Sequence, residues 1–103
     1  MVDTMEITKD YNGNDLTVKV EGRIDTVTSQ VLDREFEEEY DKLSSLTLDC
    51  EKLEYISSAG LRILIQTEKE LKGMGKTFTI ININDTIKEI LRMSGIDKLL
   101  NIQ

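Results

Sequence analysis

Hydrophobic and polar residues alternate in the first quarter of the chain, which is the pattern of half-buried β-strands. Residues 5–8 and 16–21 alternate in this way. An Asn-Gly pair, Asn12-Gly13, lies between the two segments and is typical of a tight turn between antiparallel strands. The chain is therefore expected to open with a β-hairpin whose second strand ends at Gly22.

The next segment repeats apolar residues every three or four positions, as an amphipathic helix does. Asp25 or Thr26 is placed to cap this helix by accepting from its first N–H groups. The apolar stripe consists of Leu32, Phe36, Tyr40 and Leu43. Four glutamates fall mostly outside the stripe, which indicates a solvated face or, as the alternative, a surface that faces a partner. They are Glu35, Glu37, Glu38 and Glu39.

Strands and helices alternate in the second half of the chain. Strands are predicted at residues 46–50 and 78–83. The second of these is nearly all apolar, which favours a central parallel strand covered on both faces. A helix over residues 58–72 lies between them, with Gly73 expected in the left-handed conformation at its C-terminus.

A shorter helix is predicted after this strand, capped by Asn84 or Asp85 and closed by Gly95, with a short amphipathic piece over residues 96–100. The order of elements predicts an α/β fold with a mixed sheet of four to five strands flanked by about four helices. A length of 103 residues suits one core, so we expect a single domain over residues 1–103.

Composition excludes several classes of function. The net charge of -7 argues against a nucleic-acid partner, because phosphates are bound by Lys and Arg. No apolar run approaches the roughly 18 residues of a membrane span, and residues 1–4 do not begin a signal peptide, so we expect a cytoplasmic protein. Histidine is absent, which removes the Ser-His-Asp mechanism and the commonest transition-metal ligand. The protein is therefore not expected to be an enzyme.

Two residues at the end of the strand predicted at residues 46–50 invite chemical interpretations. Cys50 is the only cysteine, and its position indicates a small buried side chain in place of a reactive thiol. Asp49 is interpreted as a carboxylate that supports a loop, because no second carboxylate cluster is evident for a metal. A Gly-rich phosphate loop of the Walker type is also absent. We therefore expect neither a metal nor a cofactor.

The candidate functional segment spans residues 55–64, where two hydroxyls and a glycine stand between a strand and a helix. A phosphate on such a serine would lie over free backbone N–H groups, where the helix dipole favours negative charge. Ser57 or Ser58 equally fits the simpler role of helix N-cap. A nucleophilic Ser58 is disfavoured, because the Gly-x-Ser-x-Gly elbow and a histidine base are both missing.

Four motifs in order carry a family resemblance. They are Gly-Arg-Ile-Asp at residues 22–25, Leu-Thr-Leu-Asp at 46–49, Tyr-Ile-Ser-Ser-Ala-Gly-Leu at 55–61 and Arg-Met-Ser-Gly-Ile-Asp-Lys-Leu at 92–99. With these motifs almost the whole chain resembles the STAS domain of bacterial anti-sigma factor antagonists. The resemblance implies a small sheet flanked by helices and a regulatory partner switch.

In that family, an anti-sigma factor that is also a serine kinase phosphorylates a serine just before the second helix. The unphosphorylated antagonist binds this kinase and frees a sigma factor, the phosphorylated form is released, and a PP2C-type phosphatase resets the switch. Aligned on Gly60, the resemblance implies that Ser58 is the acceptor and that Asp25 belongs to the kinase-docking surface. The full implied docking set is Asp25, Thr26, Ser57, Ala59, Gly60 and Arg62.

Three positions depart from the family pattern. The usual aspartate before the acceptor is Ser57, the small hydroxyl residue after it is Ala59, and a common second glycine is Arg62. The missing aspartate leaves an alternative open, namely a STAS adaptor that acts without phosphorylation in a signalling or membrane-transport assembly. Arg62, one turn along from Ser58, is a candidate to hold a phosphate.

Overall fold

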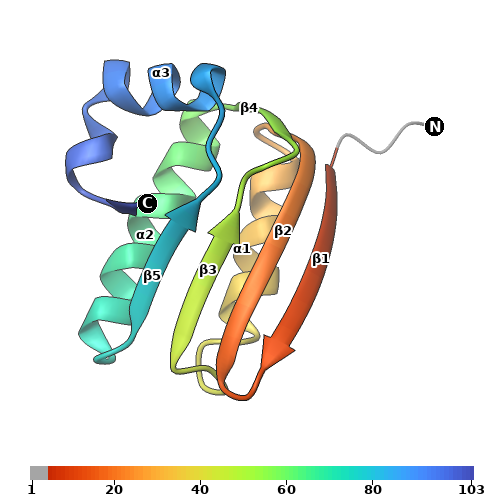
Figure 1. Cartoon of the computed structure of the whole chain (residues 1–103), viewed down its shortest axis with the longest axis vertical. Coiled ribbons are helices and arrows are strands. Elements are labelled where there is room, and N and C mark those ends of the chain that lie inside the picture. The colour runs from red at the N-terminus through yellow and green to blue at the C-terminus, as the bar shows by residue number, and fades with distance from the viewer. Residues whose placement is uncertain (1–4) are drawn as a thin grey trace.

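A mixed β-sheet with helices packed against it makes up the computed structural model, which describes residues 5–103 (Figure 1). The strands are β1 (Met5–Asn12), β2 (Asp15–Ile24), β3 (Ser45–Asp49), β4 (Leu53–Ile56), β5 (Thr77–Ile81) and β6 (Asn101–Ile102). The helices are α1 (Thr28–Glu37), α2 (Ser58–Gly73), α3 (Asp85–Ser94) and the 3₁₀ turn η1 (Ile96–Lys98). The strand order is β1-β2-β3-β5-β6, with β4 paired to β2. The predicted mixed α/β sheet is confirmed.

Helices α1 and α2 both cover the same face of the sheet (Figure 1). The crossovers through α1 and α2 each lead to a parallel strand further along the same direction of the sheet. Because such crossovers are right-handed, helices that advance in one direction fall on one face. The core lies between this face and the helices, and it includes Val18, Leu48 and Ile80, none of them exposed.

The opposite face of the sheet is polar. Thr17 of β2 pairs in register with Thr47 of β3, which pairs with Thr79 of β5. All three threonines are half-buried, and Thr77 of β5 is exposed. The prediction that the strand at residues 78–83 is covered on both faces is therefore wrong, although the strand is interior and parallel to both neighbours.

The opening hairpin is confirmed, with a turn that differs in detail from the expected one. Asn12 pairs with Asp15, so Gly13 and Asn14 are the two central residues. Gly13 has φ 62, while Asn14 is not among the residues with positive φ. Glycine at the first central position with positive φ fits a type II′ turn, whose twist matches that of the strands.

The second strand continues past Gly22, which was expected to end it. Gly22 has φ 100 and lies at a register shift, after which Arg23 and Ile24 pair with Tyr55 and Ile56 of β4. A glycine at positive φ lets the strand bend without ending, as in a β-bulge. The bend transfers β2 from β3 to β4 and so places Asp25 beside the start of α2.

Two helix ends also differ from the prediction. Helix α1 ends at Glu37, so Tyr40 and Leu43 pack into the core from the segment that follows it. Gly73 is still helical, and Gly75 is the residue with positive φ, at 73°. In contrast, the predicted ends of α3 are confirmed: Asn84 caps its N-terminus and Gly95 closes it in the left-handed conformation.

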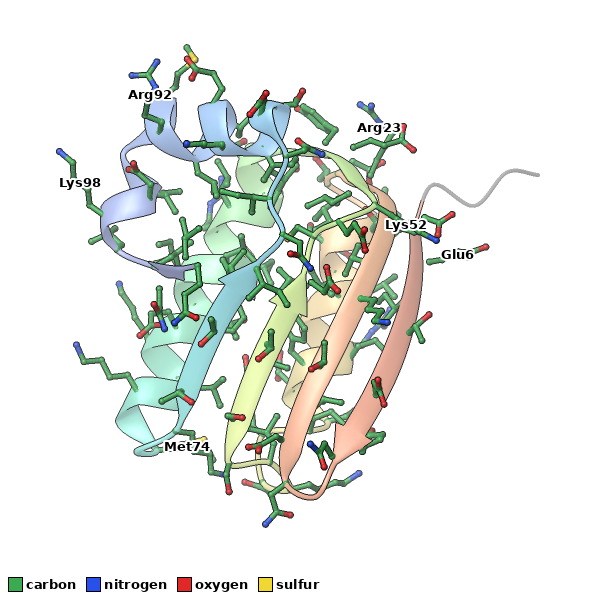
Figure 2. All side chains as sticks on the ribbon, viewed as in Figure 1. Glu6, Arg23, Lys52, Met74, Arg92 and Lys98 are labelled. Carbon is green, nitrogen blue, oxygen red and sulfur yellow. The ribbon has the colours of Figure 1, made fainter. Side chains whose placement is uncertain are left out.

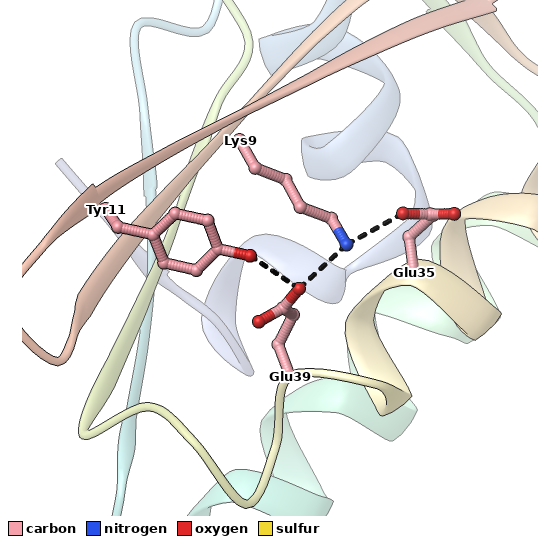
Figure 3. Close-up of polar contacts among 4 residues, drawn as sticks. All are labelled: Lys9, Tyr11, Glu35 and Glu39. Carbon is pink, nitrogen blue, oxygen red and sulfur yellow. Dashed lines mark hydrogen bonds and ion pairs between the residues drawn. The ribbon is translucent and has the colours of Figure 1, made fainter.

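One of the four glutamates expected on a solvated face is buried. Glu39 has 4% of its surface exposed, and its Oε2 accepts hydrogen bonds from Lys9 Nζ at 2.8 Å and Tyr11 Oη at 2.7 Å (Figure 3). Lys9 Nζ also lies 2.7 Å from Glu35 Oε1. Burial opposes ionisation of Glu39, but these hydrogen bonds outweigh it and lower the pKa of its carboxyl. The cluster joins β1 to the segment after α1.

The predictions for Cys50 and Asp49 are confirmed. Cys50 is 1% exposed, and burial raises the pKa of its thiol to about 12. Asp49 Oδ1 accepts from Glu51 N at 3.0 Å and from Asn82 Nδ2 at 3.1 Å, so this carboxylate supports the turns after β3 and β5. Asn82 itself has φ 58, a left-handed conformation that asparagine tolerates better than most residues.

Candidate functional site

The pairing of β2 with β4 builds the site, because it brings the ends of two parallel strands together. Ile24 pairs with Ile56 at the last position of each strand. Immediately beyond, Ser57 N donates to Ile24 O at 2.8 Å. The loop that begins at Asp25 and the start of α2 at Ser58 therefore lie side by side at one end of the sheet.

The two adjacent serines have different structural roles. Ser57 has an extended backbone (φ -84, ψ 172) and is the N-cap of α2, where its Oγ accepts from Gly60 N at 3.2 Å. Ser58 is the first residue of the helix and is exposed. The structure thus assigns the cap to Ser57 and leaves the hydroxyl of Ser58 facing solvent.

Asp25 organises the neighbouring loop through its side chain. Its Oδ1 accepts from Val27 N at 3.0 Å and from Thr28 N at 2.9 Å, and its own N–H donates to Thr28 Oγ1 at 2.7 Å. The hydrogen bond from the Thr28 backbone is the main cause that lowers the pKa of the Asp25 carboxyl. Asp25 therefore presents a charged carboxylate in a turn that it fixes itself, two residues before the N-cap position of α1, Val27.

Gly60 differs from the other predicted docking residues because it is buried. A Cβ at this position would lie 2.6 Å from Ile24 Cγ2 and 2.6 Å from Ile56 Cγ1. Real side chains do not approach so closely, and glycine lets the first turn of α2 lie against the ends of β2 and β4. The role of Gly60 that the structure supports is packing.

The other predicted residues lie near the surface. Thr26 and Arg62 are exposed, and Ala59 is half-buried. Thr26 O accepts from Ser29 Oγ at 3.0 Å, which ties the loop to the first turn of α1. The structure thus brings Asp25, Thr26, Ser57, Ser58 and Ala59 to one end of the sheet, with Arg62 one helical turn further along α2.

Two features of this end were missed in the sequence. Val27 is 72% exposed, although it follows directly on Asp25 and Thr26. The sequence signal that could have identified Val27 is an apolar residue inside a polar loop. Arg23 stacks on the ring of Tyr55, with the guanidinium carbon 4.4 Å from the ring centroid, and projects outward from this end (Figure 2). The register of β2 with β4 creates this pair, so no local pattern predicted it.

Helix α3 completes this end of the molecule (Figure 1). Asn84, its N-cap, donates from Nδ2 to Leu53 O of β4 at 2.8 Å.

In the described part of the chain, residues 5–103, no helix has the length and apolar character needed to cross a bilayer.

Several known proteins are similar to this chain in sequence or in structure. BtrV of Bordetella bronchiseptica, a candidate anti-sigma factor antagonist, is 27% identical over 92 residues, which cover 88% of this chain and 79% of BtrV. The crystal structure of an anti-sigma factor antagonist from Mycobacterium paratuberculosis has a TM-score of 0.85 at 24% identity, covering 95% of this chain and 84% of that one.

The Bacillus protein SpoIIAA, an anti-sigma factor antagonist, has the same fold. Its unphosphorylated form has a TM-score of 0.81 at 12% identity and covers 95% of this chain and 88% of SpoIIAA. Its phosphorylated form has a TM-score of 0.75, also at 12% identity, with 95% and 91% covered. The STAS domain family model matches residues 6–103 of this chain, nearly its whole length. The chain belongs to the STAS domain family.

Proposed function

We propose that this protein is an anti-sigma factor antagonist whose binding to an anti-sigma factor is controlled by phosphorylation of Ser58. The anti-sigma factor is a serine kinase that transfers the terminal phosphoryl group of ATP to Ser58 Oγ and releases ADP. A PP2C-type phosphatase removes the phosphate by hydrolysis. The unphosphorylated protein binds the anti-sigma factor and thereby permits sigma-dependent transcription. On this proposal the protein acts in the cytoplasm, as a binding protein with no catalysis of its own.

One observation carries the proposal: Ser58 is exposed at the start of α2 while Ser57 makes the helix cap. In the family pattern an aspartate occupies the position of Ser57. Both aspartate and serine are good N-cap residues, so Ser57 supplies the same hydrogen bond to the helix and leaves the acceptor in place. The relatives named as anti-sigma factor antagonists, and SpoIIAA with its phosphorylated form, support the same function.

The proposed docking surface consists of Asp25, Thr26, Ser57, Ala59 and Arg62, with Val27 as an exposed apolar contact. A phosphoserine adds about 1.5 to 2 negative charges at neutral pH. One such charge facing a like charge about 4 Å away at an interface costs about 4 kcal/mol, and about 1.4 kcal/mol already changes affinity tenfold. At the helix N-terminus the same charge is mildly favourable, so the fold persists and the partner is released.

A kinase assay tests the proposal. The purified protein is incubated with ATP and the serine-kinase anti-sigma factors of its source organism, each shown to be active on its own antagonist, and intact mass is measured. We expect a gain of one phosphate in the wild type and in Ser57→Ala, and none in Ser58→Ala. An unchanged wild-type mass with every active kinase would contradict the proposal.

A second candidate is a STAS adaptor that works without phosphorylation in a signalling or transport assembly. The observation in its favour is the uncharged Ser57 in place of the family aspartate. On this hypothesis a partner captured by the wild-type protein is also captured by Ser58→Asp with the same affinity. A large loss of binding in Ser58→Asp, with Ser58→Asn as the uncharged control, excludes the adaptor and supports the switch.

A further inference from the structure

Arg62 is an exposed cation of α2 at a distance of four residues from Ser58. In the described part of the chain its guanidinium takes part in no ion pair; the cations that do are Lys9, Lys52 and Arg92. The first turn of α2 contains no acidic residue, and the first one along the helix is Glu68. Arg62 is thus a cation without a carboxylate partner on its own helix face.

Helix geometry places Ser58 and Arg62 together. Side chains four residues apart are neighbours on the helix surface, and long side chains lean toward the helix N-terminus. An anion that precedes a cation at this spacing is the favourable order, because it also agrees with the helix dipole. An arginine at position 62 that follows this tendency extends over the turn that begins at Ser58.

The chemistry of the two groups is complementary once Ser58 carries a phosphate. A phosphoserine offers three acceptor oxygens, and the planar guanidinium donates two parallel N–H bonds to such a group. Ser57 adds no negative charge beside the phosphate, unlike the aspartate of the family pattern. The other nearby cation, Arg23, is stacked on Tyr55.

We infer that Arg62 binds the phosphate of phosphorylated Ser58 as an intrahelical pair. The inference rests on the proposed phosphorylation of Ser58 and describes how that phosphorylation changes the docking surface. Phosphorylation then changes two features that a partner meets: it introduces an anion, and it engages a guanidinium that has no ion-pair partner among residues 5–103 of the unmodified protein. A partner that contacts Arg62 through a carboxylate loses that contact at the moment when the phosphate appears.

The test uses protein with phosphoserine installed at position 58 during translation, so no kinase is needed. Titration followed by ³¹P NMR gives the second pKa of the phosphate in the wild type and in Arg62→Gln. An exposed ion pair at this spacing should lower this pKa by roughly 0.2 to 0.4 unit in the wild type relative to Arg62→Gln. Arg62→Lys should give an intermediate value, because lysine keeps the charge and loses the bidentate fork.

Two control variants identify the cation. Lys69→Gln removes an exposed charge of the same helix. Lys69 lies about 16 Å from Ser58 along the helix axis, from a rise of about 1.5 Å per residue, so the pKa of the phosphate should not change. Arg23→Gln tests the competing guanidinium. Equal pKa values for the wild type and Arg62→Gln, or a shift carried by Arg23→Gln alone, would overturn the inference. Either result leaves the kinase assay unaffected, and a failed kinase assay leaves this titration unaffected.

Discussion

Ser57 Oγ accepts a hydrogen bond from the backbone N–H of Gly60 at 3.2 Å. This bond separates the functions of two adjacent serines, because one hydroxyl is engaged in the helix cap and the next one faces solvent. It also explains how the chain dispenses with the aspartate of the family pattern. A serine supplies the same acceptor to the first turn of α2 without adding a charge beside Ser58.

The cap makes a prediction for stability. Ser57→Ala removes the acceptor of the Gly60 N–H and should lower the free energy of unfolding by about 1 kcal/mol. Ser57→Asp restores an acceptor and adds a charge that the helix dipole favours, so it should be at least as stable as the wild type. Urea unfolding monitored by circular dichroism measures both. An alanine variant as stable as the wild type would show that the cap contributes nothing.

Gly60 is predicted to be required for packing. In Gly60→Ala the new methyl group meets Ile24 and Ile56, and the repacking should cost about 2 kcal/mol. Gly73→Ala is the matched control at the other end of α2, where an added Cβ meets no atom within 4 Å. Replacing glycine by alanine in a helix should stabilise there, by up to about 1 kcal/mol. Equal effects at both glycines in thermal unfolding would contradict the role given to Gly60.

Stability should depend on Lys9 as long as the buried carboxylate of Glu39 is present. Lys9→Met leaves the buried Glu39 carboxylate without its cation and should destabilise the protein by about 3 kcal/mol. The double variant Lys9→Met/Glu39→Met removes both charges and should recover most of this loss, because an apolar pair of similar volume packs without desolvation of ions. Chemical unfolding of the wild type, Lys9→Met, Glu39→Met and the double variant completes a double-mutant cycle, and simple additivity would exclude the coupling.

The same carboxylate predicts a pH dependence. The pKa of Glu39 in the folded protein is below its ordinary value of 4.5, so its contribution to stability is complete above about pH 5 and is lost as the pH falls through the folded pKa. The lowered pKa of Asp25 acts in the same direction. The melting temperature of the wild type should therefore fall as the pH is lowered below about 5. In Glu39→Gln this fall should be shallower, and parallel curves would refute the assignment to Glu39.

Asp25 allows its structural and docking roles to be separated. Asn keeps an Oδ1 that accepts from Val27 N and Thr28 N, whereas Ala keeps neither bond. Asp25→Asn should thus keep most of the stability that Asp25→Ala loses, giving up only the part that the charge adds to these hydrogen bonds. It should weaken binding to the proposed anti-sigma factor about tenfold, the effect of losing one charged contact of about 1.4 kcal/mol. Isothermal titration calorimetry measures the affinity. Wild-type affinity in Asp25→Asn together with weak binding in Asp25→Ala would show that Asp25 only stabilises the turn and that its charge does not contact the partner.

The sequence alone determined those features that depend on neighbouring residues. Alternation of apolar side chains predicted the hairpin, and three- and four-residue spacing predicted the helices, because each element forms hydrogen bonds within or close to its own segment. Asn84 and Gly95 marked the ends of α3 by the same local rules. The absence of histidine and the motif at residues 55–61 limited the interpretation of the site before any contact was known.

Tertiary structure decided what depends on residues far apart in the chain. Gly22 bends β2 because the strand changes partner there, and only the register with β4 places Asp25 beside Ser58. Glu39 leaves the solvated face because Lys9 and Tyr11, about 30 residues earlier, reach it from β1. A periodic pattern specifies which side of an element is apolar, but burial of a charge depends on whether a partner from another element compensates its lost hydration.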